Sequence, residues 1–281
     1  MTDPFRITGP AVISFSGGRT SGYMLWRIVQ AHGGTLPDDV VVLFANTGRE
    51  MPATLQFVRD VATNFGVRVR WLEYRHEPGR HYYEEVGHNS ASINGEPFEA
   101  YLSAKSALPN PVQRSCTTEL KIRTIKRFVV AELGWKNWTS IIGLRADEPR
   151  RVERSSIKPR DRWTNFMPLA VAGITKADVL AFWRAQSFDL MLAGPWEGNC
   201  DGCFLKSRAS RMWMIRHHPE RMAWWAAMEA VPRGTAGRGR TFRNDVEHYA
   251  KLAQIVADTP LLPIDETMHE EGAECGGGCG I

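Results

Sequence analysis

The sequence predicts an α/β fold, in which a parallel sheet is covered by helices on both faces and is followed by a helical, cysteine-containing C-terminal segment. Through the first two-thirds of the 281 residues, apolar β-branched runs alternate with amphipathic helical stretches. This order favours parallel strands joined by helical crossovers. After about Pro195 the strand pattern ends, and helical, tryptophan-rich sequence and a glycine-rich tail follow. We therefore expect an α/β domain at residues 1–194 and a helical region at residues 195–281.

The expected elements are placed by their hydrophobic periodicity. Short apolar or alternating runs predict strands, whereas apolar residues spaced three or four apart predict helices. The expected strands lie at residues 11–15, 41–46, 67–74 and 139–145. The expected helices lie at residues 23–32, 52–66, 118–134 and 175–186, with Gly66 ending the second and Thr175 capping the last. The segment 75–111 is poor in periodicity and holds several Gly, Pro and His residues, which predicts a long loop or lid.

The composition favours a globular protein that uses metal or redox chemistry. Hydrophobic residues make up 43% of the chain, enough for a core, and the net charge of +4 does not by itself imply nucleic acid. The start, "MTDPFRITGP", has no signal pattern, and no apolar run approaches the length of a membrane span. We therefore expect a cytoplasmic protein with no membrane partner. Five cysteines without an export signal favour metal binding or redox chemistry over a disulfide framework.

The stretch "SFSGGRTSGY" (Ser14–Tyr23) joins the first expected strand to the first expected helix. Glycines allow a ligand to approach the backbone closely. Ser and Thr cap helix starts, and the free N–H groups there attract an anion. Neither the Walker pattern nor the dinucleotide GxGxxG pattern is present. The stretch therefore predicts a phosphate site, with a glycine turn that serves only tight packing as the alternative.

The residues Ser16-Gly17-Gly18-Arg19-Thr20-Ser21 resemble the SGGxxS signature of the PP-loop ATP pyrophosphatases. These proteins form one superfamily, adenine nucleotide α-hydrolase-like, with the phosphoadenosine phosphosulfate (PAPS) reductases. The resemblance implies that Ser14 and the six residues of the signature bind the phosphates of ATP or of an adenylylated sulfate (PAPS or APS), with Mg²⁺. The commoner form has Asp where Thr20 stands, which leaves the handling of the metal open.

Two further strand-end turns resemble elements of the same family. Asn46-Thr47-Gly48 resembles the "DTG" element, with Asn in place of Asp, and "IIGLRADE" (residues 141–148) resembles the "GxRxDE" element. The nucleotide contacts that these resemblances imply are Asn46, Thr47, Gly48, Gly143 and Arg145. Arg145 can meet a phosphate or a developing negative charge with its fork of N–H groups, so we also expect it to be catalytic. The alternatives are an ordinary turn at the first position and a surface ion-pair cluster at the second.

The cysteines give the second strong signal. Cys116 lies in "RSCTTELK", Cys200 and Cys203 form a Cys-x2-Cys pair, and Cys275 and Cys279 lie in the tail. A lone Cys-x2-Cys pair suits zinc, an iron–sulfur cluster or a dithiol. "RSCTTELK" resembles the "CTxxLK" element of iron–sulfur members of the superfamily, including the DNA phosphorothioation enzymes.

This resemblance implies a [4Fe–4S] cluster held by Cys116, Cys200 and Cys203. The fourth iron is then open or bound by a tail cysteine, for which Cys279 is the candidate. One alternative is zinc, for which Cys200, Cys203, Cys275 and Cys279 have an acceptable four-thiolate spacing. The other alternative is that these cysteines bind no metal.

The tail resembles a second element of the family. Glu274-Cys275-Gly276 resembles the "ECG" motif that carries the nucleophilic cysteine of assimilatory PAPS reductases. The resemblance implies that Cys275 is a catalytic nucleophile and that a thiol donor such as a thioredoxin is a partner. For a glycine-rich tail the alternative is a disordered end.

The segment 204–228 mixes arginines with tryptophans. Such mixing suits nucleic acid as a partner. The alternative is a pair of amphipathic helices with tryptophans in the core and arginines in water.

Together the motifs identify a member of the PAPS reductase family that binds an adenine nucleotide and carries out iron–sulfur-dependent sulfur transfer or reduction. In the reductase mechanism a cysteine thiolate attacks the sulfur of an adenylylated sulfate, and a nucleotide leaves. In the pyrophosphatase mechanism ATP adenylates an oxygen of the substrate, such as a nucleic acid, and sulfur then displaces AMP. A non-catalytic accessory protein that binds nucleotide or nucleic acid is the third alternative.

Overall fold

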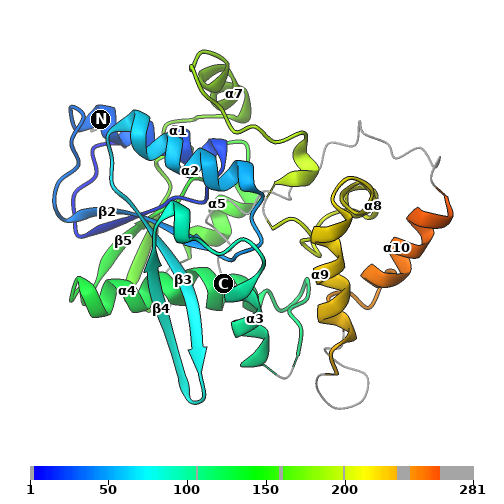
Figure 1. Cartoon of the computed structure of the whole chain (residues 1–281). Helices are drawn as coiled ribbons and strands as arrows, with labels where there is room; N and C mark the ends of the chain where they lie inside the picture. Colours follow the sequence, from blue (N-terminus) through cyan, green and yellow to red (C-terminus); the bar gives the residue numbers. More distant parts are fainter. Residues whose placement is uncertain (1–2, 106, 158–160, 199, 233–240, 260–281) are drawn as a thin grey trace.

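A six-stranded sheet forms the centre of the computed structural model, which describes residues 3–105, 107–157, 161–198, 200–232 and 241–259 (Figure 1). The strands are β1 (Ala11–Ser14), β2 (Val40–Asn46), β3 (Val69–Glu77), β4 (Arg80–Val86), β5 (Trp138–Ile141) and β6 (Trp163–Phe166). Their order across the sheet is β4-β3-β2-β1-β5-β6. Each neighbouring pair is parallel except β3 with β4 at the edge, so the predicted α/β class is confirmed.

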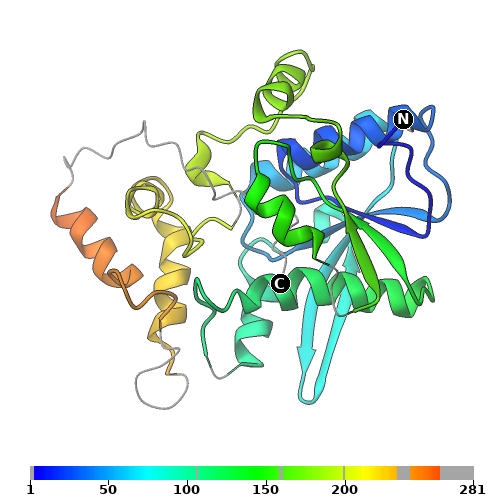
Figure 2. The ribbon, with the colours of Figure 1, turned by 180° about the vertical axis from the view of Figure 1, so that it is seen from behind.

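Helices cover both faces of this sheet. The helices are α1 (Arg19–Ala31), α2 (Pro52–Phe65), α3 (Glu96–Ser103), α4 (Thr124–Glu132), α5 (Pro149–Ser156), α6 (Pro168–Val171), α7 (Lys176–Arg184), α8 (Arg208–His217), α9 (Pro219–Ala230) and α10 (Tyr249–Asp258). Short helical turns are η1 (His88–Ser90), the π-helical η2 (Thr117–Arg123) and η3 (Pro195–Glu197). Helices α1 and α2 lie on one face of the sheet and α4 lies on the other (Figures 1 and 2). Within the described residues, no helix is both long and apolar enough to span a bilayer.

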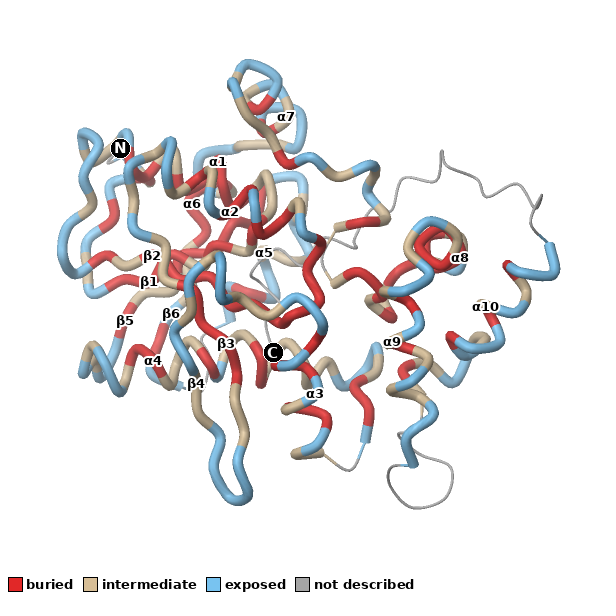
Figure 3. The backbone as a smooth tube through the Cα atoms, viewed as in Figure 1, coloured by how far each residue is buried: buried red, intermediate tan, exposed pale blue. Residues whose placement is uncertain are grey.

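Successive residues of the central strands pack on opposite faces, as the pleat of a strand requires. Ile13, Val42 and Phe44 share a core with α1 and α2. Val12 and Leu43 share a core with α4. The central strands are therefore buried on both sides, whereas the tip of the β3–β4 hairpin is exposed (Figure 3).

A separate core joins α3 to the helices α8, α9 and α10 of the C-terminal region. Trp213 and Trp225 are buried in it, with 7% and 1% of their surface exposed. The predicted helical character after Pro195 is thus confirmed for the described part of that region. The expected separation of core tryptophans from solvated arginines holds only in part, because Arg211 is also buried.

The long loop predicted at residues 75–111 is wrong over much of its length. β3 continues to Glu77, the chain turns at Gly79, and β4 pairs back along β3 before α3 begins. Ion pairs replace apolar alternation on this hairpin, as between Arg75 and Glu84 with an Nη2–Oε2 distance of 2.7 Å. A strand whose cross-strand pairs are charged gives no hydrophobic period, so the sequence pattern missed it.

The predicted helix at residues 118–134 is divided into two parts. It opens with the π-helical η2 and continues as α4, which ends at Glu132. The Thr124 hydroxyl donates to the carbonyl of Glu119, five residues earlier, at 2.9 Å. Such π-helical turns occur frequently at functional sites, and this one follows directly after Cys116.

Candidate functional site

Three turns that the sequence singles out lie at one edge of the sheet. β1 lies between β2 and β5, and all three strands are parallel. The segments that follow them, at residues 15–18, 47–51 and 142–148, therefore emerge at the same edge. In open α/β sheets, ligands bind at this carboxyl edge of the strands.

The first turn (residues 15–18) uses its two glycines differently. Gly17 has a φ of +77°, and a Cβ atom there would lie 2.8 Å from Thr54 Cγ2. Gly17 is therefore required by the backbone conformation and by packing against α2. Among the described atoms, a Cβ at Gly18 would meet only Ser16 Oγ within 4 Å, at 3.6 Å. The protein thus leaves space beside Gly18.

Ser21 holds the first turn in shape. Its hydroxyl accepts from the Ser16 N–H at 3.2 Å, lies 2.9 Å from the Ser16 hydroxyl, and donates to the Gly18 carbonyl at 3.0 Å. Gly18 is the N-cap of α1, and no side chain of the described residues caps this helix. The first N–H groups of α1 are therefore left for a ligand, and a helix N-terminus favours an anionic one. Ser14, at the end of β1, is half-buried next to this turn.

The side chain of Arg19 is hydrogen-bonded to residues outside the first turn. Its guanidinium donates to Asp189 through Nε at 2.7 Å and through Nη2 at 2.8 Å, and Nη2 also reaches the Leu190 carbonyl at 2.7 Å. The Trp183 indole N–H donates to the Arg19 carbonyl at 2.8 Å. Although the sequence predicts a nucleotide contact at Arg19, its side chain here fastens α1 to the segment after α7.

Arg145 joins the third turn to the first. The side chain is buried, and it donates from Nη1 to Thr20 Oγ1 at 3.0 Å and from Nε to Asp147 Oδ1 at 2.9 Å. Gly143 lies close to α1, because a Cβ there would be 3.3 Å from the Ser21 Cα. Burial alone would raise the pKa of Asp147. Hydrogen bonds from the Lys176 N–H and from Arg145 outweigh burial and lower this pKa. The structure thus brings together two of the sequence motifs, and Arg145 also makes the ion pairs that the alternative interpretation expects.

The second turn (residues 47–51) has its polar groups bonded inside the protein. The buried Asn46 amide donates to Glu73 Oε1 at 2.5 Å and to the Ser92 carbonyl at 2.9 Å. The side-chain oxygen of Asn46, Oδ1, accepts from the Gly48 N–H at 3.0 Å. Asn46, predicted to contact the nucleotide, is therefore occupied by the protein's own groups.

Thr47 links the second turn to the cysteine pair. Its hydroxyl donates to Glu50 Oε2 at 2.8 Å and lies 3.4 Å from Cys200 Sγ. Glu50 also accepts from the Thr47 N–H at 2.9 Å, and its backbone forms an antiparallel bridge with Cys200. Lys121 Nζ lies 3.7 Å from the other Glu50 oxygen.

Asp201, between the two cysteines of the pair, is the centre of a buried ion network. Arg49 Nη2 donates to Asp201 Oδ2 at 2.5 Å and Arg221 Nε donates to the same oxygen at 2.6 Å. The Trp225 indole N–H donates to Asp201 Oδ1 at 2.7 Å. The exposed fractions of the Arg49 and Asp201 side chains are 3% and 0%. We call Arg49, Asp201, Arg221 and Trp225 the Asp201 clamp.

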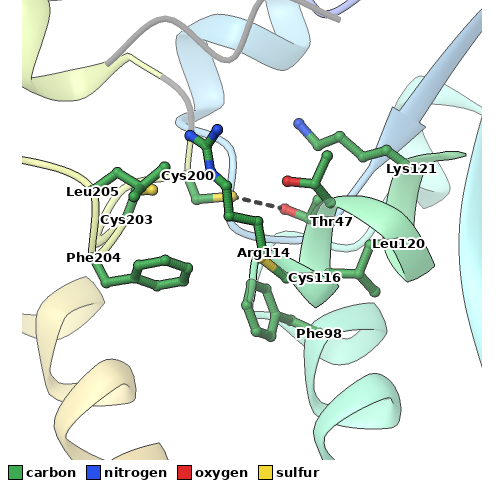
Figure 4. Close-up of a pocket in the computed structure, with 11 residues that line it drawn as sticks. Thr47, Phe98, Arg114, Cys116, Leu120, Lys121, Cys200, Cys203, Phe204 and Leu205 are labelled. Atoms are coloured by element: carbon green, nitrogen blue, oxygen red, sulfur yellow. Dashed lines mark hydrogen bonds between the residues drawn. The ribbon is translucent and has the colours of Figure 1, made fainter. Parts of the chain in front are cut away.

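The cysteines predicted to bind a cluster line one pocket (Figure 4). The residues that line it are Thr47, Phe98, Arg114, Cys116, Thr117, Leu120, Lys121, Cys200, Cys203, Phe204 and Leu205. Cys116 comes from the start of η2, whereas Cys200 and Cys203 come from the loop between η3 and α8. Cys275 and Cys279 lie outside the described residues, so the structure does not place the predicted nucleophile or the predicted tail ligand.

The pocket thiols are half-buried. Burial, together with the neighbouring Glu50 carboxylate, raises the pKa of the Cys200 thiol well above its usual value. Among the described residues, no three His, Cys, Asp or Glu side chains are arranged around a single metal-ion position.

The sequence pattern did not single out Arg49, Glu50, Glu73, Arg114 or Asp201. Arg49 and Glu50 directly follow the "NTG" motif, and Asp201 stands inside the Cys-x2-Cys pair, so their positions alone were a weak signal. The two residues of such a pair can lie 152 positions apart along the chain, as Arg49 and Asp201 do. No local sequence pattern reveals a contact of that kind.

Comparisons with known proteins identify the family of the chain. The family model "Phosphoadenosine phosphosulfate reductase domain" matches residues 10–191, which include the three turns and Cys116. The chain therefore belongs to the phosphoadenosine phosphosulfate reductase family.

Two individual proteins show more limited similarity. The uncharacterized nin region protein ORF290 of Escherichia phage lambda is 32% identical over 207 residues, which are 70% of this chain and 66% of that protein. The chain thus spans just under two thirds of that relative. A solved structure is also similar, that of the U34-tRNA thiolase NcsA from Methanococcus maripaludis with its [4Fe–4S] cluster. The match covers 88% of this chain and 80% of the thiolase chain, with 14% sequence identity and a TM-score of 0.40.

Proposed function

We propose that this chain is an adenine-nucleotide-dependent sulfur enzyme, with a phosphate site at the first turn and a sulfur site at the cysteine pocket. The main support for this proposal is the position of the cysteine pocket. Cys116, Cys200 and Cys203 line one pocket together with Thr47, which follows β2 at the same edge of the sheet as the first turn. Nucleotide and sulfur chemistry can therefore meet at this edge.

The first turn supports the phosphate site. Gly18 leaves open space, the start of α1 has no side-chain cap, and Ser16 is held in place by Ser21. Arg145 bonds to Thr20 and brings a guanidinium next to the turn. These features suit the phosphates of ATP or of an adenylylated sulfate, with Mg²⁺ as the counterion.

The residues of the cysteine pocket support the proposal of an iron–sulfur cluster. Thiolates that bind separate irons surround a cluster and do not meet at one point, which agrees with three cysteines spread around a pocket. Among the described residues, the lining includes Arg114 and Lys121 and no carboxylate. Arg114 Nε is buried and finds no hydrogen-bond partner among the described residues. A buried donor of this kind needs a partner, and a cluster with three thiolates supplies an anionic one. Zinc remains the alternative metal.

A bound cluster supplies thiolate-held iron on which sulfur can be carried. The chain's own residues would bind ATP so that an acceptor oxygen attacks its α-phosphorus, and the bond to the bridging oxygen breaks as pyrophosphate leaves. Arg145 would offset the negative charge that develops there. Sulfide then attacks the adenylylated acceptor atom, and AMP leaves with the acceptor oxygen, so no oxidant or reductant is consumed. Nucleic acid is the acceptor class that the family resemblance suggests, but the burial of Trp213 and Trp225 does not favour base stacking on them.

Reduction of an adenylylated sulfate is the second candidate, and the "ECG" resemblance at Cys275 favours it. The Cys275 thiolate would attack the sulfur, the bond from sulfur to the nucleotide's phosphate oxygen would break, and the nucleotide would leave. A dithiol donor such as a thioredoxin would then release sulfite and be oxidised to a disulfide.

Two assays on anaerobically purified full-length protein test the proposal. We expect bound iron and acid-labile sulfide, both lost in Cys116→Ala and in Cys203→Ala and retained in Cys275→Ala. We expect pyrophosphate release from ATP when sulfide and an acceptor are present. Stoichiometric zinc without iron would contradict the cluster, and sulfite release from PAPS or APS without pyrophosphate release would favour the reductase.

A further inference from the structure

The second turn carries a family motif for nucleotide binding, yet its contacts lead to the cysteine pair. The Asp201 N–H donates to the Arg49 carbonyl at 2.8 Å, and Arg221 Nη2 donates to the Glu50 carbonyl at 2.9 Å. Glu50 and Cys200 also form an antiparallel backbone bridge. Backbone and side chains thus fasten residues 49–50 to residues 200–201.

We propose that the second turn and the Asp201 clamp position Cys200 in the cysteine pocket, and that Asp201 is the positioning residue. The importance of that pocket rests on the proposed function, whereas the positioning itself does not. Asp201 is fully buried and accepts from Arg49, Arg221, Trp225 and its own neighbour, the Gly202 N–H at 2.7 Å. Since Asp201 directly follows Cys200, a shift of this carboxylate moves the thiol.

Thr47 provides the direct contact between the turn and the thiol. Its hydroxyl lies 3.4 Å from Cys200 Sγ and donates to Glu50 at 2.8 Å. Asn46, on the other side of Thr47, is fixed by the buried Glu73 at 2.5 Å. The second turn is therefore held by Glu73 on the side of the sheet and by Asp201 on the side of the cysteines. These contacts leave the turn little freedom to change its conformation when a nucleotide binds.

A second Arg–Asp pair provides a matched control. Arg19 and Asp189 join the start of α1 to the segment after α7, with side chains that are 34% and 32% exposed. This pair has the same chemistry as Arg49 with Asp201, but it touches neither the second turn nor a cysteine.

The experiment measures alkylation of each cysteine by iodoacetamide in metal-free full-length protein, using mass spectrometry to separate the sites. In Asp201→Asn, we expect Cys200 and Cys203 to react at least roughly tenfold faster, because the loop that carries them opens locally. Cys116, the residue directly before η2, is the internal control, and its rate should change by less than about twofold. Thr47→Val should accelerate Cys200 alone, and Asp189→Asn should leave all three rates unchanged.

Two outcomes would overturn the proposal. If all three cysteines accelerate by the same factor in Asp201→Asn, the residue only supports global stability. If none accelerates, the clamp does not position Cys200. Should Asp201→Asn fail to fold, Arg221→Gln keeps the Arg49–Asp201 pair and gives the same comparison with a smaller expected change. The alkylation experiment uses metal-free protein. Its outcome therefore stays valid even if the purified protein contains no iron–sulfur cluster.

Discussion

The first and second turns follow neighbouring parallel strands, and both carry glycine-containing motifs of one family, but they differ in where their polar groups bond. The first turn leaves space beside Gly18 and an uncapped start of α1. The second turn has the Asn46 side chain, the Thr47 hydroxyl and the Arg49 guanidinium bonded to the protein. We therefore propose that the two turns have different roles, and that the open space beside Gly18 makes the first turn the phosphate site.

The difference has an energetic side. An uncapped helix start in contact with water can exchange water for a phosphate at little cost. A buried ion pair, in contrast, is costly to break from one side, because the remaining charge stays buried without a partner. The first turn can thus bind a phosphate without losing internal contacts, whereas the polar groups of the second turn already stabilise the fold.

The largest expected effect concerns the two Arg–Asp pairs. Asp201→Asn should lower the free energy of unfolding by about 3–5 kcal/mol, because Arg49 and Arg221 lose a buried carboxylate. Asp189→Asn should lower it by less than about 1 kcal/mol, because the pair with Arg19 is one-third exposed and screened by water. Urea denaturation of both variants measures the difference. Equal losses would show that the buried clamp is no more important than the outer pair.

The two glycines of the first turn sharpen the comparison within one loop. Gly17→Ala should cost about 2–3 kcal/mol of stability, because alanine is strained at positive φ and its Cβ would crowd Thr54. Gly18→Ala should change stability by less than about 0.5 kcal/mol, because its φ of −103° suits any residue and the space is open. Thermal denaturation in the absence of nucleotide tests this order, and a greater loss at Gly18 would contradict the open space.

The sequence predicted the first turn and the convergence of Cys116 with Cys200 and Cys203, because these depend on short motifs and on parallel strand order. It missed β4 and the Asp201 clamp. β4 is stabilised by cross-strand charges such as Arg75 with Glu84, which have no apolar period. The clamp joins residues 152 positions apart, so only the folded chain shows that Arg49 and Asp201 are partners. The tail with Cys275 and Cys279 lies outside the described residues, and its roles stay predictions.

The smallest expected effect is a dependence of stability on pH at the third turn. Hydrogen bonds from Lys176 and Arg145 lower the pKa of Asp147 in the folded protein despite its partial burial. The stability that this carboxylate contributes is therefore present above its unfolded pKa of about 3.9 and is lost as the pH falls through the lower folded value. Asp147→Asn should remove this part of the acid dependence in denaturation curves between pH 5 and pH 2. An unchanged acid dependence would show that Asp147 is not linked to folding.

The most direct test of the contrast between the two turns is the affinity for ATP, measured by calorimetry with Mg²⁺ on the full chain. Gly18→Val fills the open space, so affinity should fall at least roughly tenfold while the fold survives. Thr47→Val removes the hydroxyl that contacts Glu50 and Cys200, and we expect the affinity to stay within about twofold because this hydroxyl is already bonded inside the protein. If Thr47→Val weakens ATP binding as strongly as Gly18→Val, or if Gly18→Val binds normally, the assignment of the two turns is contradicted.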